Sequence, residues 1–264
     1  DFIDALDQPT VDGFNTYFIS RFTKQLGLKV ALSGLGGDEL FGGYPSFQRM
    51  KIVNHYLNIK KNIIPNKFFK AIIPNKLIAK KNSRLIDIVN AKDLFESYIA
   101  LRGIFSKKEA SNIVKKLSGR TIDKFPKNSY ENGNINSTTR DLELNNYLKN
   151  QLLRDSDIFG MKWSTEIRTP FIDKNFVSKI KSLPDKYIFE KNKGILSEAL
   201  DLPLHIINKK KQGFTFPFES WLKNSLGEQI KNETTPIIGN DNEWFKIWTV
   251  FILKKWIEKH AQYL

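Results

Sequence analysis

The 264-residue sequence contains no cysteine, which removes several kinds of chemistry at once. A chain without thiols forms no disulfides, has no Cys-ligated zinc and offers no thiol nucleophile. Histidine is nearly as scarce: His55, His205 and His260 lie far apart and show no i, i+4 pairing. We therefore expect neither a histidine-based metal site nor a Ser-His-Asp triad.

The sequence also lacks long apolar runs and a recognisable leader. Its apolar runs are far shorter than the roughly 20 residues that a membrane-spanning helix needs. The first 13 residues, DFIDALDQPTVDG, have the features of neither a signal peptide nor a transit peptide. We therefore expect a cytoplasmic protein with no membrane partner. Because the first residue is Asp1 rather than Met, we also expect a piece of a longer protein.

Acidic residues are in deficit, with 28 Asp and Glu against 42 Lys and Arg and a net charge of +14. The stretch from Arg49 to Arg84 contains no acid at all. Such a balance favours anionic partners, including nucleotide phosphates and nucleic acid, although a soluble lysine-rich surface explains it equally well. A basic helical nucleic-acid-binding module is therefore one alternative, which no nucleic-acid motif supports.

Helical periodicity dominates the patterns that are present. Phe14, Phe18 and Phe22 recur at i, i+4 and i+8 after Asp12, a potential N-cap, and Gly27 offers a stop. Together with a hydrophobic content of 41%, the length suffices for one sizeable core. We expect a single domain over residues 1–264.

Further helices are expected along the rest of the chain. The segment 106–109 reads SKKE, a capping box, and leucines at 144, 148 and 152 mark another helix. Trp244, Trp248 and Ile252 predict a terminal helix docked on the core. The polar segment 128–141 is predicted to be an exposed connection.

One strand is predicted, at LKVAL (28–32), where a short apolar run bounded by glycine is typical of a buried strand. Few strand signals follow residue 33, and the segment DELF is expected to open another helix. The order is therefore helix, strand, glycine-rich loop and helix. We expect an α/β fold that is mostly helical.

The loop itself, SGLGGDELFGGY (33–44), matches neither a Walker A sequence nor a dinucleotide G-x-G-x-x-G. Backbone N–H groups at Gly34, Gly36 and Gly37, with the hydroxyl of Ser33, could still contact an anion where a strand leads into a helix. The adjacent acids, Asp38 and Glu39, would repel a phosphate unless a divalent metal lay between them. The stretch suits a metal-bound polyphosphate; the alternative is a glycine-rich turn with a capping Asp.

Several motifs together carry a family resemblance that covers nearly the whole chain. They are S-G-x-G-x-D-E-x-F-x-G-Y at Ser33–Tyr44, L-L-R-D-x-D at Leu152–Asp157, E-x-R-x-P-F-x-D at Glu166–Asp173 and basic-x-K-x-G-F-x-x-P at Lys209–Pro217. In this order and spacing they resemble the synthetase half of the glutamine-dependent asparagine synthetases. Their order makes the signal more specific than any single motif.

The resemblance implies a fold, a reaction and a set of roles. The fold is part of an adenine-nucleotide α-hydrolase-like parallel-sheet domain with a helical C-terminal portion. ATP and Mg²⁺ activate a small carboxylate as an acyl-adenylate, which ammonia from a separate glutaminase domain attacks. By position, Ser33, Gly34, Gly36 and Gly37 would bind ATP and pyrophosphate, with Asp38 or Glu39 near magnesium.

The catalytic roles that the resemblance implies fall on three residues. Lys211 would neutralise charge on the transferring phosphate. Tyr44 and Glu166 match a tyrosine–glutamate pair that acts as base in related β-lactam-forming synthetases. If these roles hold, Ser33, Tyr44, Glu166 and Lys211 line one cleft at the end of the strand, with Tyr44 and Glu166 near hydrogen-bonding range.

Two features depart from the family pattern. The S-G-G-x-D-S pyrophosphate loop is absent, so this loop, its strand and the glutaminase domain are expected as missing N-terminal partners. Leu35 stands where the family commonly has an acid tied to adenylation or to ammonia deprotonation. We therefore expect this chain alone to be inactive. A second alternative is a family member that has lost catalysis and serves as an assembly partner.

Overall fold

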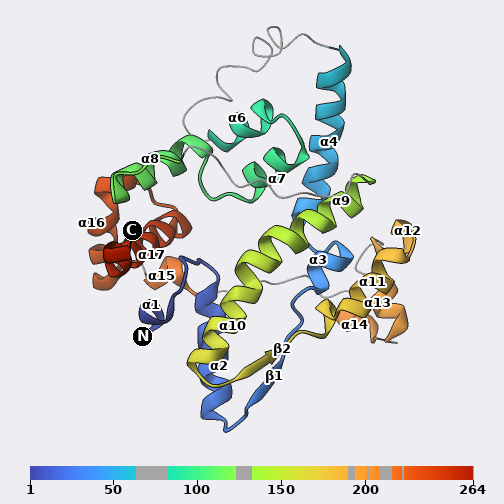
Figure 1. Cartoon of the computed structure of the whole chain (residues 1–264), viewed down its shortest axis with the longest axis horizontal. Helices are drawn as coiled ribbons and strands as arrows, with labels where there is room; N and C mark the ends of the chain where they lie inside the picture. Colours follow the sequence, from blue (N-terminus) through green and yellow to red (C-terminus); the bar gives the residue numbers. More distant parts are fainter. Residues whose placement is uncertain are drawn as a thin grey trace.

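The computed structural model describes residues 1–63, 83–122, 133–189, 194–200, 202–207, 216–221 and 223–263. Within these ranges the chain is mostly helical, with a small parallel sheet (Figure 1). The first part comprises α1 (Phe2–Ala5), α2 (Gly13–Gln25), β1 (Val30–Leu32), α3 (Gly37–Phe41), α4 (Pro45–Ile63), α6 (Ser83–Asn90), α7 (Leu94–Arg102) and α8 (Lys107–Ser118).

The second part begins with three helical segments that follow one another directly: α9 (Ile135–Leu142), the π-helix η1 (Glu143–Leu152) and α10 (Leu153–Lys162). After them come β2 (Glu166–Arg168), the 3₁₀ turn η2 (Pro170–Ile172), α11 (Lys174–Ser182), α12 (Asp185–Ile188), α13 (Gly194–Ala199), α14 (Leu204–Ile207), α15 (Phe218–Trp221), α16 (Ser225–Ile238), α17 (Trp244–His260) and η4 (Ala261–Tyr263).

The sheet consists of β1 and β2, which run parallel and side by side (Figure 1). Val30 pairs with Glu166 and Leu32 with Arg168, and the N–H of Ser33 extends the ladder to the carbonyl of Arg168 at 2.8 Å. The predicted strand is therefore confirmed at residues 30–32. The second strand was not predicted, because three residues of alternating polarity give almost no periodic signal.

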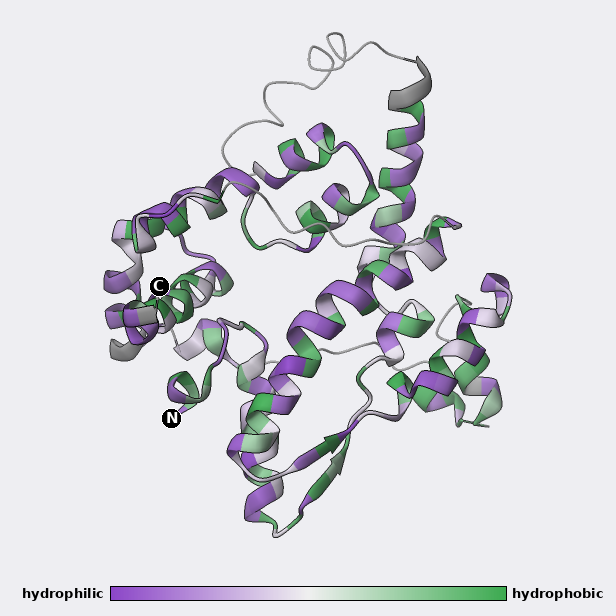
Figure 2. Ribbon diagram, in the orientation of Figure 1, coloured by the Kyte–Doolittle hydropathy of each residue, from purple (hydrophilic) through white to green (hydrophobic). Residues whose placement is uncertain are grey.

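The prediction that this strand is buried was wrong. Val30 is 39% exposed and Leu32 is 77% exposed. Only the other face is covered: Ile167 lies over α10, where a Cβ on Gly160 would sit 3.7 Å from its Cγ1. Figure 2 shows the strands at the lower edge of the molecule with hydrophobic residues in both. Within the described residues, one face of this parallel sheet is without the cover that such sheets usually have.

The largest core cluster joins the two ends of the chain. Phe2 of α1 stacks on Phe159 of α10 and on Trp248 of α17, with ring centroids 5.3 and 6.3 Å apart. The predicted terminal helix is thus confirmed as docked on the core through Trp248 and Ile252. Aromatic rings fill much of this cluster, and each buried ring contributes a large apolar area.

Helix α2 matches its predicted bounds and supplies Phe14 and Phe18 to the same cluster. Phe22, expected on the same buried face, is 54% exposed because the cluster ends about one turn before it. Asp12 makes no side-chain cap bond; instead the hydroxyl of Thr10 accepts from the N–H of Gly13 at 3.2 Å. Asp12 is therefore the N-cap residue of α2 by position, as predicted, but its side chain does not cap the helix.

The predicted exposed connection at 128–141 is also corrected. Residues 123–132 lie outside the described ranges, but residues 135–141 belong to α9. The polar side chains of Thr138, Thr139, Arg140 and Asp141 are buried there. Burial is tolerated where partners exist, as for the Thr139 hydroxyl, which donates to the carbonyl of Ile135 at 2.6 Å.

Two other helix predictions are confirmed. The Ser106–Glu109 capping box forms with both reciprocal bonds and opens α8. The leucine pattern at 144–152 is helical, although the turns are of the wider π type. No helix in the described part of the chain is long and apolar enough to cross a membrane.

Candidate functional site

The glycine-rich loop begins where β1 ends and leads directly into α3. Gly36 adopts a left-handed conformation with φ of 93° and serves as the N-cap of α3. A Cβ on Gly36 would sit 2.4 Å from Cγ2 of Ile172, whereas a Cβ on Gly34 would meet nothing within 4 Å. The two glycines therefore have different roles. Gly36 allows the loop to pack closely against η2, and Gly34 leaves open space beside the loop.

Ser33 and Leu35 line this turn. The N–H of Leu35 donates to the hydroxyl oxygen of Ser33 at 3.4 Å, and the N–H of Gly37 donates to the carbonyl of Gly34 at 3.1 Å. Leu35 is half-buried in the loop, and its side chain has no group that could exchange a proton or bind a metal. Polar groups for a ligand at this turn therefore come from Ser33 and from the backbone.

The two acids of the loop have different surroundings. Glu39 is 1% exposed and accepts a 2.8 Å hydrogen bond from the hydroxyl of Tyr44. Burial raises the pKa of Glu39, and the Tyr44 bond opposes that shift. Asp38 is half-buried. Because Glu39 faces Tyr44, Asp38 is the better candidate for a magnesium ligand from this loop, and no cluster of three metal-binding side chains occurs among the described residues.

The expected hydrogen bond between Tyr44 and Glu166 is not formed. The carboxylate of Glu166 instead accepts from Nε of Arg168 at 2.9 Å, and both side chains are 60% exposed. The sheet register explains this result, because it places Glu166 beside Val30, three residues before Ser33. Glu166 therefore lies at the opposite end of the sheet from the loop. Lys211 lies outside the described residues, so its position is not part of this geometry.

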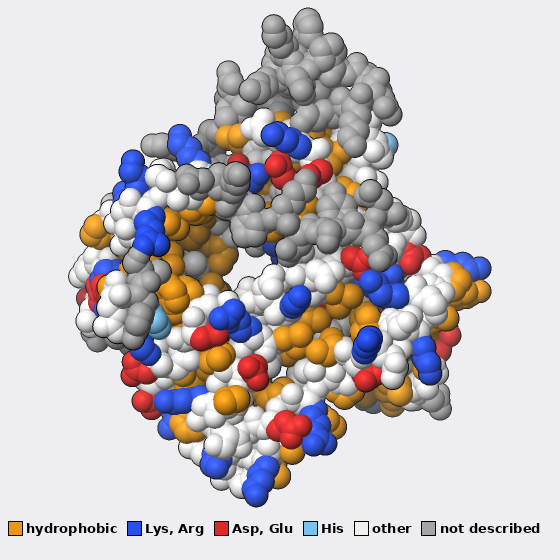
Figure 3. Space-filling view, in the orientation of Figure 1, with side chains coloured by type: hydrophobic (Ala, Val, Ile, Leu, Met, Phe, Trp, Pro, Cys, Tyr) orange, Lys and Arg blue, Asp and Glu red, His pale blue; other side chains and the backbone are white. Residues whose placement is uncertain are grey.

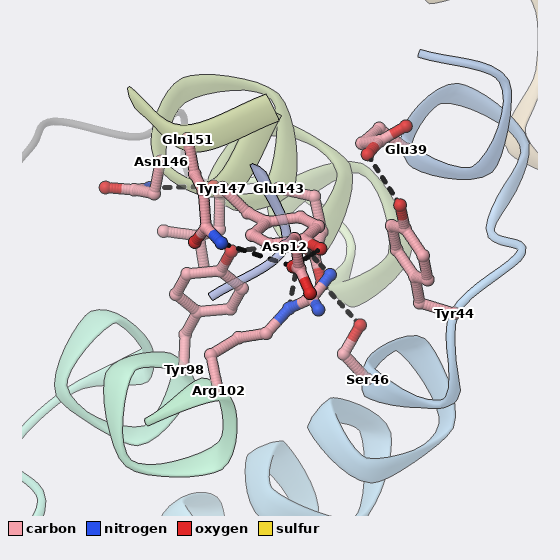
Figure 4. Close-up of polar contacts among 11 residues, drawn as sticks. Asp12, Glu39, Tyr44, Ser46, Tyr98, Arg102, Glu143, Asn146, Tyr147 and Gln151 are labelled. Atoms are coloured by element: carbon pink, nitrogen blue, oxygen red, sulfur yellow. Dashed lines mark hydrogen bonds and ion pairs between the residues drawn. The ribbon is translucent and has the colours of Figure 1, made fainter. Parts of the chain in front are cut away.

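A buried ionic cluster behind the loop was missed by the sequence analysis (Figure 4). Glu143, at the start of η1, is fully buried and lies opposite Arg102, the last residue of α7. Nε of Arg102 donates to both carboxylate oxygens at 3.1 Å, and Nη2 donates to Oε2 at 2.5 Å. Tyr98 donates to the same carboxylate at 3.0 Å. The hydroxyl of Ser46 also donates to it. An acid amid the leucines at 142, 144 and 148 was the available sequence signal.

The guanidinium of Arg102 also links this cluster to the loop. Its Cζ lies 4.5 Å from the ring centroid of Tyr44 and 4.0 Å from that of Tyr147. The hydroxyl of Tyr147 donates to Asp12 at 2.7 Å, and Gln151 donates to the same carboxylate oxygen at 3.2 Å. Asp12 thus anchors η1, which is what its side chain does in place of capping α2.

The buried charge of Glu143 is balanced by that of Arg102. Burial disfavours the charged form of Arg102, but its hydrogen bonds to Glu143 outweigh that effect and raise its pKa. Burial raises the pKa of the Tyr44 hydroxyl, and the nearby Glu39 raises it further. Tyr44 therefore holds its proton and acts as a hydrogen-bond donor to Glu39.

The remaining basic side chains form no single patch on the face in Figure 3. Described Lys and Arg residues there are scattered and lie among acidic ones. Some basic residues of the described part are paired with acids: Lys254 and Lys255 each lie beside Glu233, at 2.7 and 2.8 Å. This distribution is that of a solvated surface rather than of a basic groove on that face.

Comparisons with known proteins agree with the motifs. A family model described as asparagine synthase matches residues 1–247. Asparagine synthetase (glutamine-hydrolyzing) 1 from Bacillus subtilis (strain 168) is 28% identical over 284 aligned residues, which cover 95% of this chain and 44% of that protein. Putative asparagine synthetases (glutamine-hydrolyzing) from Mycobacterium bovis and Mycobacterium tuberculosis are 25% identical over 236 residues, or 83% of this chain and 34% of theirs. No solved structure matches.

Proposed function

This chain belongs to the asparagine synthase family, and we propose that it is the C-terminal part of a synthetase that forms an amide from a small carboxylate, ammonia and ATP. A carboxylate oxygen attacks the α-phosphorus of ATP, the bond to the β-phosphate breaks, and pyrophosphate leaves. Ammonia then attacks the acyl carbon of the adenylate, loses a proton and displaces AMP. Aspartate or a close analogue is the carboxylate that the family suggests.

One observation carries this proposal: the loop after β1 is closely packed at Gly36 but open at Gly34. An open backbone turn beside the Ser33 hydroxyl offers N–H and O–H donors to a phosphate. Asp38 is the loop carboxylate that we propose for a magnesium ion, which would supply charge neutralisation for the phosphates when bound. Lys211, by its motif, is proposed to stabilise the leaving pyrophosphate.

The geometry separates Tyr44 from Glu166, the partner that the family resemblance implies for it. Glu166 is exposed and paired with Arg168, whereas Glu39 is buried against Tyr44. We therefore propose that the pair behind the loop is Tyr44 with Glu39, and that Glu166 joins the site only when further polypeptide covers this face of the sheet. The same reasoning gives Glu39 a structural role in the loop rather than the role of a magnesium ligand.

The partner we propose is further polypeptide of the same protein. The chain spans 44% of the length of the Bacillus subtilis relative, which by its name hydrolyses glutamine. Within the described residues β1 is paired on one side only, so a strand of the added segment would continue the sheet at its other edge. Helices of the same segment would cover the exposed apolar side chains of Val30 and Leu32. That segment would also carry the pyrophosphate loop that this sequence lacks.

The test is pyrophosphate release from Mg-ATP with ammonia and a panel of carboxylates that includes aspartate. We expect release by a longer protein that contains this sequence, abolished by Ser33→Ala combined with Gly34→Val, and only background from the 264 residues alone. Turnover by the isolated chain would contradict the proposed division of the site. A longer protein that binds no Mg-ATP and releases no pyrophosphate would contradict the synthetase itself.

Leu35 favours one second candidate, a family member without catalysis that serves in assembly. The family position is commonly acidic, and the half-buried Leu35 can accept no proton. The same assay separates the two, because an assembly partner binds its polypeptide partner without releasing pyrophosphate. In a catalytic protein, Leu35→Asp leaves Mg-ATP binding intact.

A further inference from the structure

Arg102 occupies an unusual place between two aromatic rings. Its guanidinium carbon lies 4.5 Å from the ring of Tyr44 and 4.0 Å from the ring of Tyr147. The two rings are 5.9 Å apart and nearly perpendicular, at 78°. An arginine guanidinium can lie over an aromatic ring while the N–H groups at its edge donate hydrogen bonds, and a lysine ammonium lacks this planar fork of donors.

The edge of Arg102 is held by Glu143. That carboxylate is fully buried and accepts from Arg102, Tyr98 and Ser46, which come from α7 and the start of α4. A buried carboxylate with this many charge-assisted and neutral donors fixes the plane of the guanidinium. The orientation of Arg102 is therefore set by groups on three different elements.

Tyr44 connects this fixed plane to the loop. One face of its ring contacts Arg102, and its hydroxyl donates to Glu39 at 2.8 Å. Glu39 belongs to α3, whose N-cap is Gly36. The contacts therefore run from Glu143 through Arg102 and Tyr44 to the carboxyl beneath the loop. Figure 4 shows the hydrogen bonds at the two ends of this series, between Arg102 and Glu143 and between Tyr44 and Glu39.

We propose that Arg102 is a positioning residue: paired with Glu143, it holds the ring of Tyr44 so that the Tyr44 hydroxyl fixes the carboxyl of Glu39 beneath the loop. This inference rests on the proposed function in one respect only: that function is what makes the position of the Glu39 carboxyl matter. Arg102 itself touches no part of the proposed ATP site. Its effect on the loop passes through one ring and one hydrogen bond.

The test measures the titration of the Glu39 carboxyl by NMR in the 264-residue chain labelled with ¹³C in glutamate carboxyl groups. Glu39→Gln identifies the resonance. The groups that face Glu39 are the Tyr44 hydroxyl and the carboxylates of Asp38 and Glu143. Tyr44→Phe keeps the ring and removes only the donor, so the pKa of Glu39 is expected to rise by about one to two pH units.

Arg102→Lys is the decisive variant, because it keeps the positive charge opposite Glu143 and removes the guanidinium that lies over the Tyr44 ring. If Arg102 positions Tyr44, the pKa of Glu39 rises as it does in Tyr44→Phe, and the double variant shows no larger shift than Tyr44→Phe alone. A Glu39 titration unchanged from wild type in Arg102→Lys would overturn the proposal. Additive shifts in the double variant would overturn it too.

A matched control and a second variant complete the design. Arg154 is a half-exposed arginine whose Nε donates to Asp7 at 2.6 Å, and Arg154→Lys is expected to leave the Glu39 titration unchanged. If Arg102→Lys does not fold, the charge-balanced pair Arg102→Met with Glu143→Met replaces it. Because the Glu143 carboxylate itself raises the pKa of Glu39, the comparison is then between this pair with and without Tyr44→Phe. No further rise on adding Tyr44→Phe is expected, and a rise as large as that in wild type would overturn the proposal. All measurements are made without nucleotide, so failure to bind Mg-ATP contradicts the proposed function and not the role of Arg102.

Discussion

The hydroxyl of Tyr44 donates a 2.8 Å hydrogen bond to Glu39, five residues earlier in the sequence. The bond joins α3 to the residue just before α4 and closes the base of the glycine-rich loop. The shape of this loop thus depends on a buried polar contact as well as on its glycines.

Removing this donor is expected to destabilise the chain. Tyr44→Phe leaves the buried Glu39 without its hydroxyl partner, and we expect a loss of about 1–3 kcal/mol in the free energy of unfolding. Urea denaturation measures the change. Tyr187→Phe is the control, because Tyr187 is 50% exposed. Equal effects of the two substitutions would show that the Tyr44 bond contributes no specific stability.

The stability of the chain is expected to fall between about pH 4 and pH 7 because of Asp155. Burial raises the pKa of Asp155 from 3.8 to about 7, against an opposing hydrogen bond from Thr10. A raised folded-state pKa means that the contribution of this group is fully present below pH 3.8 and is lost as pH rises through 7. The loss amounts to about 4 kcal/mol at most.

Asp155→Asn tests this dependence, since the amide keeps an oxygen for the 2.7 Å bond from Thr10 and carries no charge. We expect Asn to stabilise the chain at pH 8 and to make little difference at pH 4, measured by urea midpoints at both values. Asp157→Asn, an exposed acid on the same helix, is the control. A wild-type chain and an Asp155→Asn chain with parallel pH profiles would disprove the assignment.

Gly34 and Gly36 of the glycine-rich loop are expected to respond differently to substitution by alanine. Gly36→Ala forces a side chain into a left-handed residue and against Ile172, which we expect to cost about 1–3 kcal/mol of stability. Gly34→Ala meets no atom within 4 Å and is expected to stay within about 0.5 kcal/mol of wild type. Thermal unfolding compares them. In the longer protein, Gly34→Ala should instead weaken Mg-ATP binding; a reversed order of the two stabilities would contradict this view of the loop.

Leu32 tests the uncovered face of the sheet. It is 77% exposed, so Leu32→Ser is expected to change the stability of the isolated chain by less than about 0.5 kcal/mol. In a longer protein that buries this face, the same change should cost about 1.5–3 kcal/mol. Ile52, 70% exposed on α4, is the control, and Ile52→Ser should have the same small effect in both. Equal effects of Leu32→Ser in both proteins would mean that nothing covers the strand.

The sequence predicted the features whose causes are local. The Ser106 capping box, the glycine stop after α2 and the docked helix at Trp248 depend on residues within a few positions of one another. The order of helix, strand, loop and helix over residues 13–41 followed for the same reason. The predicted exposure of 135–141 failed because polar composition does not reveal that threonines can be buried with partners inside one helix.

The site was predicted less well than the fold because its contacts are long-range. Nothing near Arg102 in the sequence indicates Glu143, which lies 41 positions later. Glu166 was assigned to Tyr44 by motif alone, and the strand register that separates them depends on a pairing between distant segments. The glycine-rich loop, by contrast, was located correctly because its turn chemistry is written in consecutive residues.

The pairing of β1 with β2 has a consequence for biosynthesis. Val30 pairs with Glu166, a separation of 136 residues, and parallel partners so far apart pay their loop-closure entropy before any contact forms. At roughly 5–20 residues per second of translation, β1 waits about 7 to 27 s for its partner to be synthesised. During that interval the apolar strand is without β2, and its unpaired backbone groups can pair with another chain. A strand synthesised earlier and already paired with β1 would protect it.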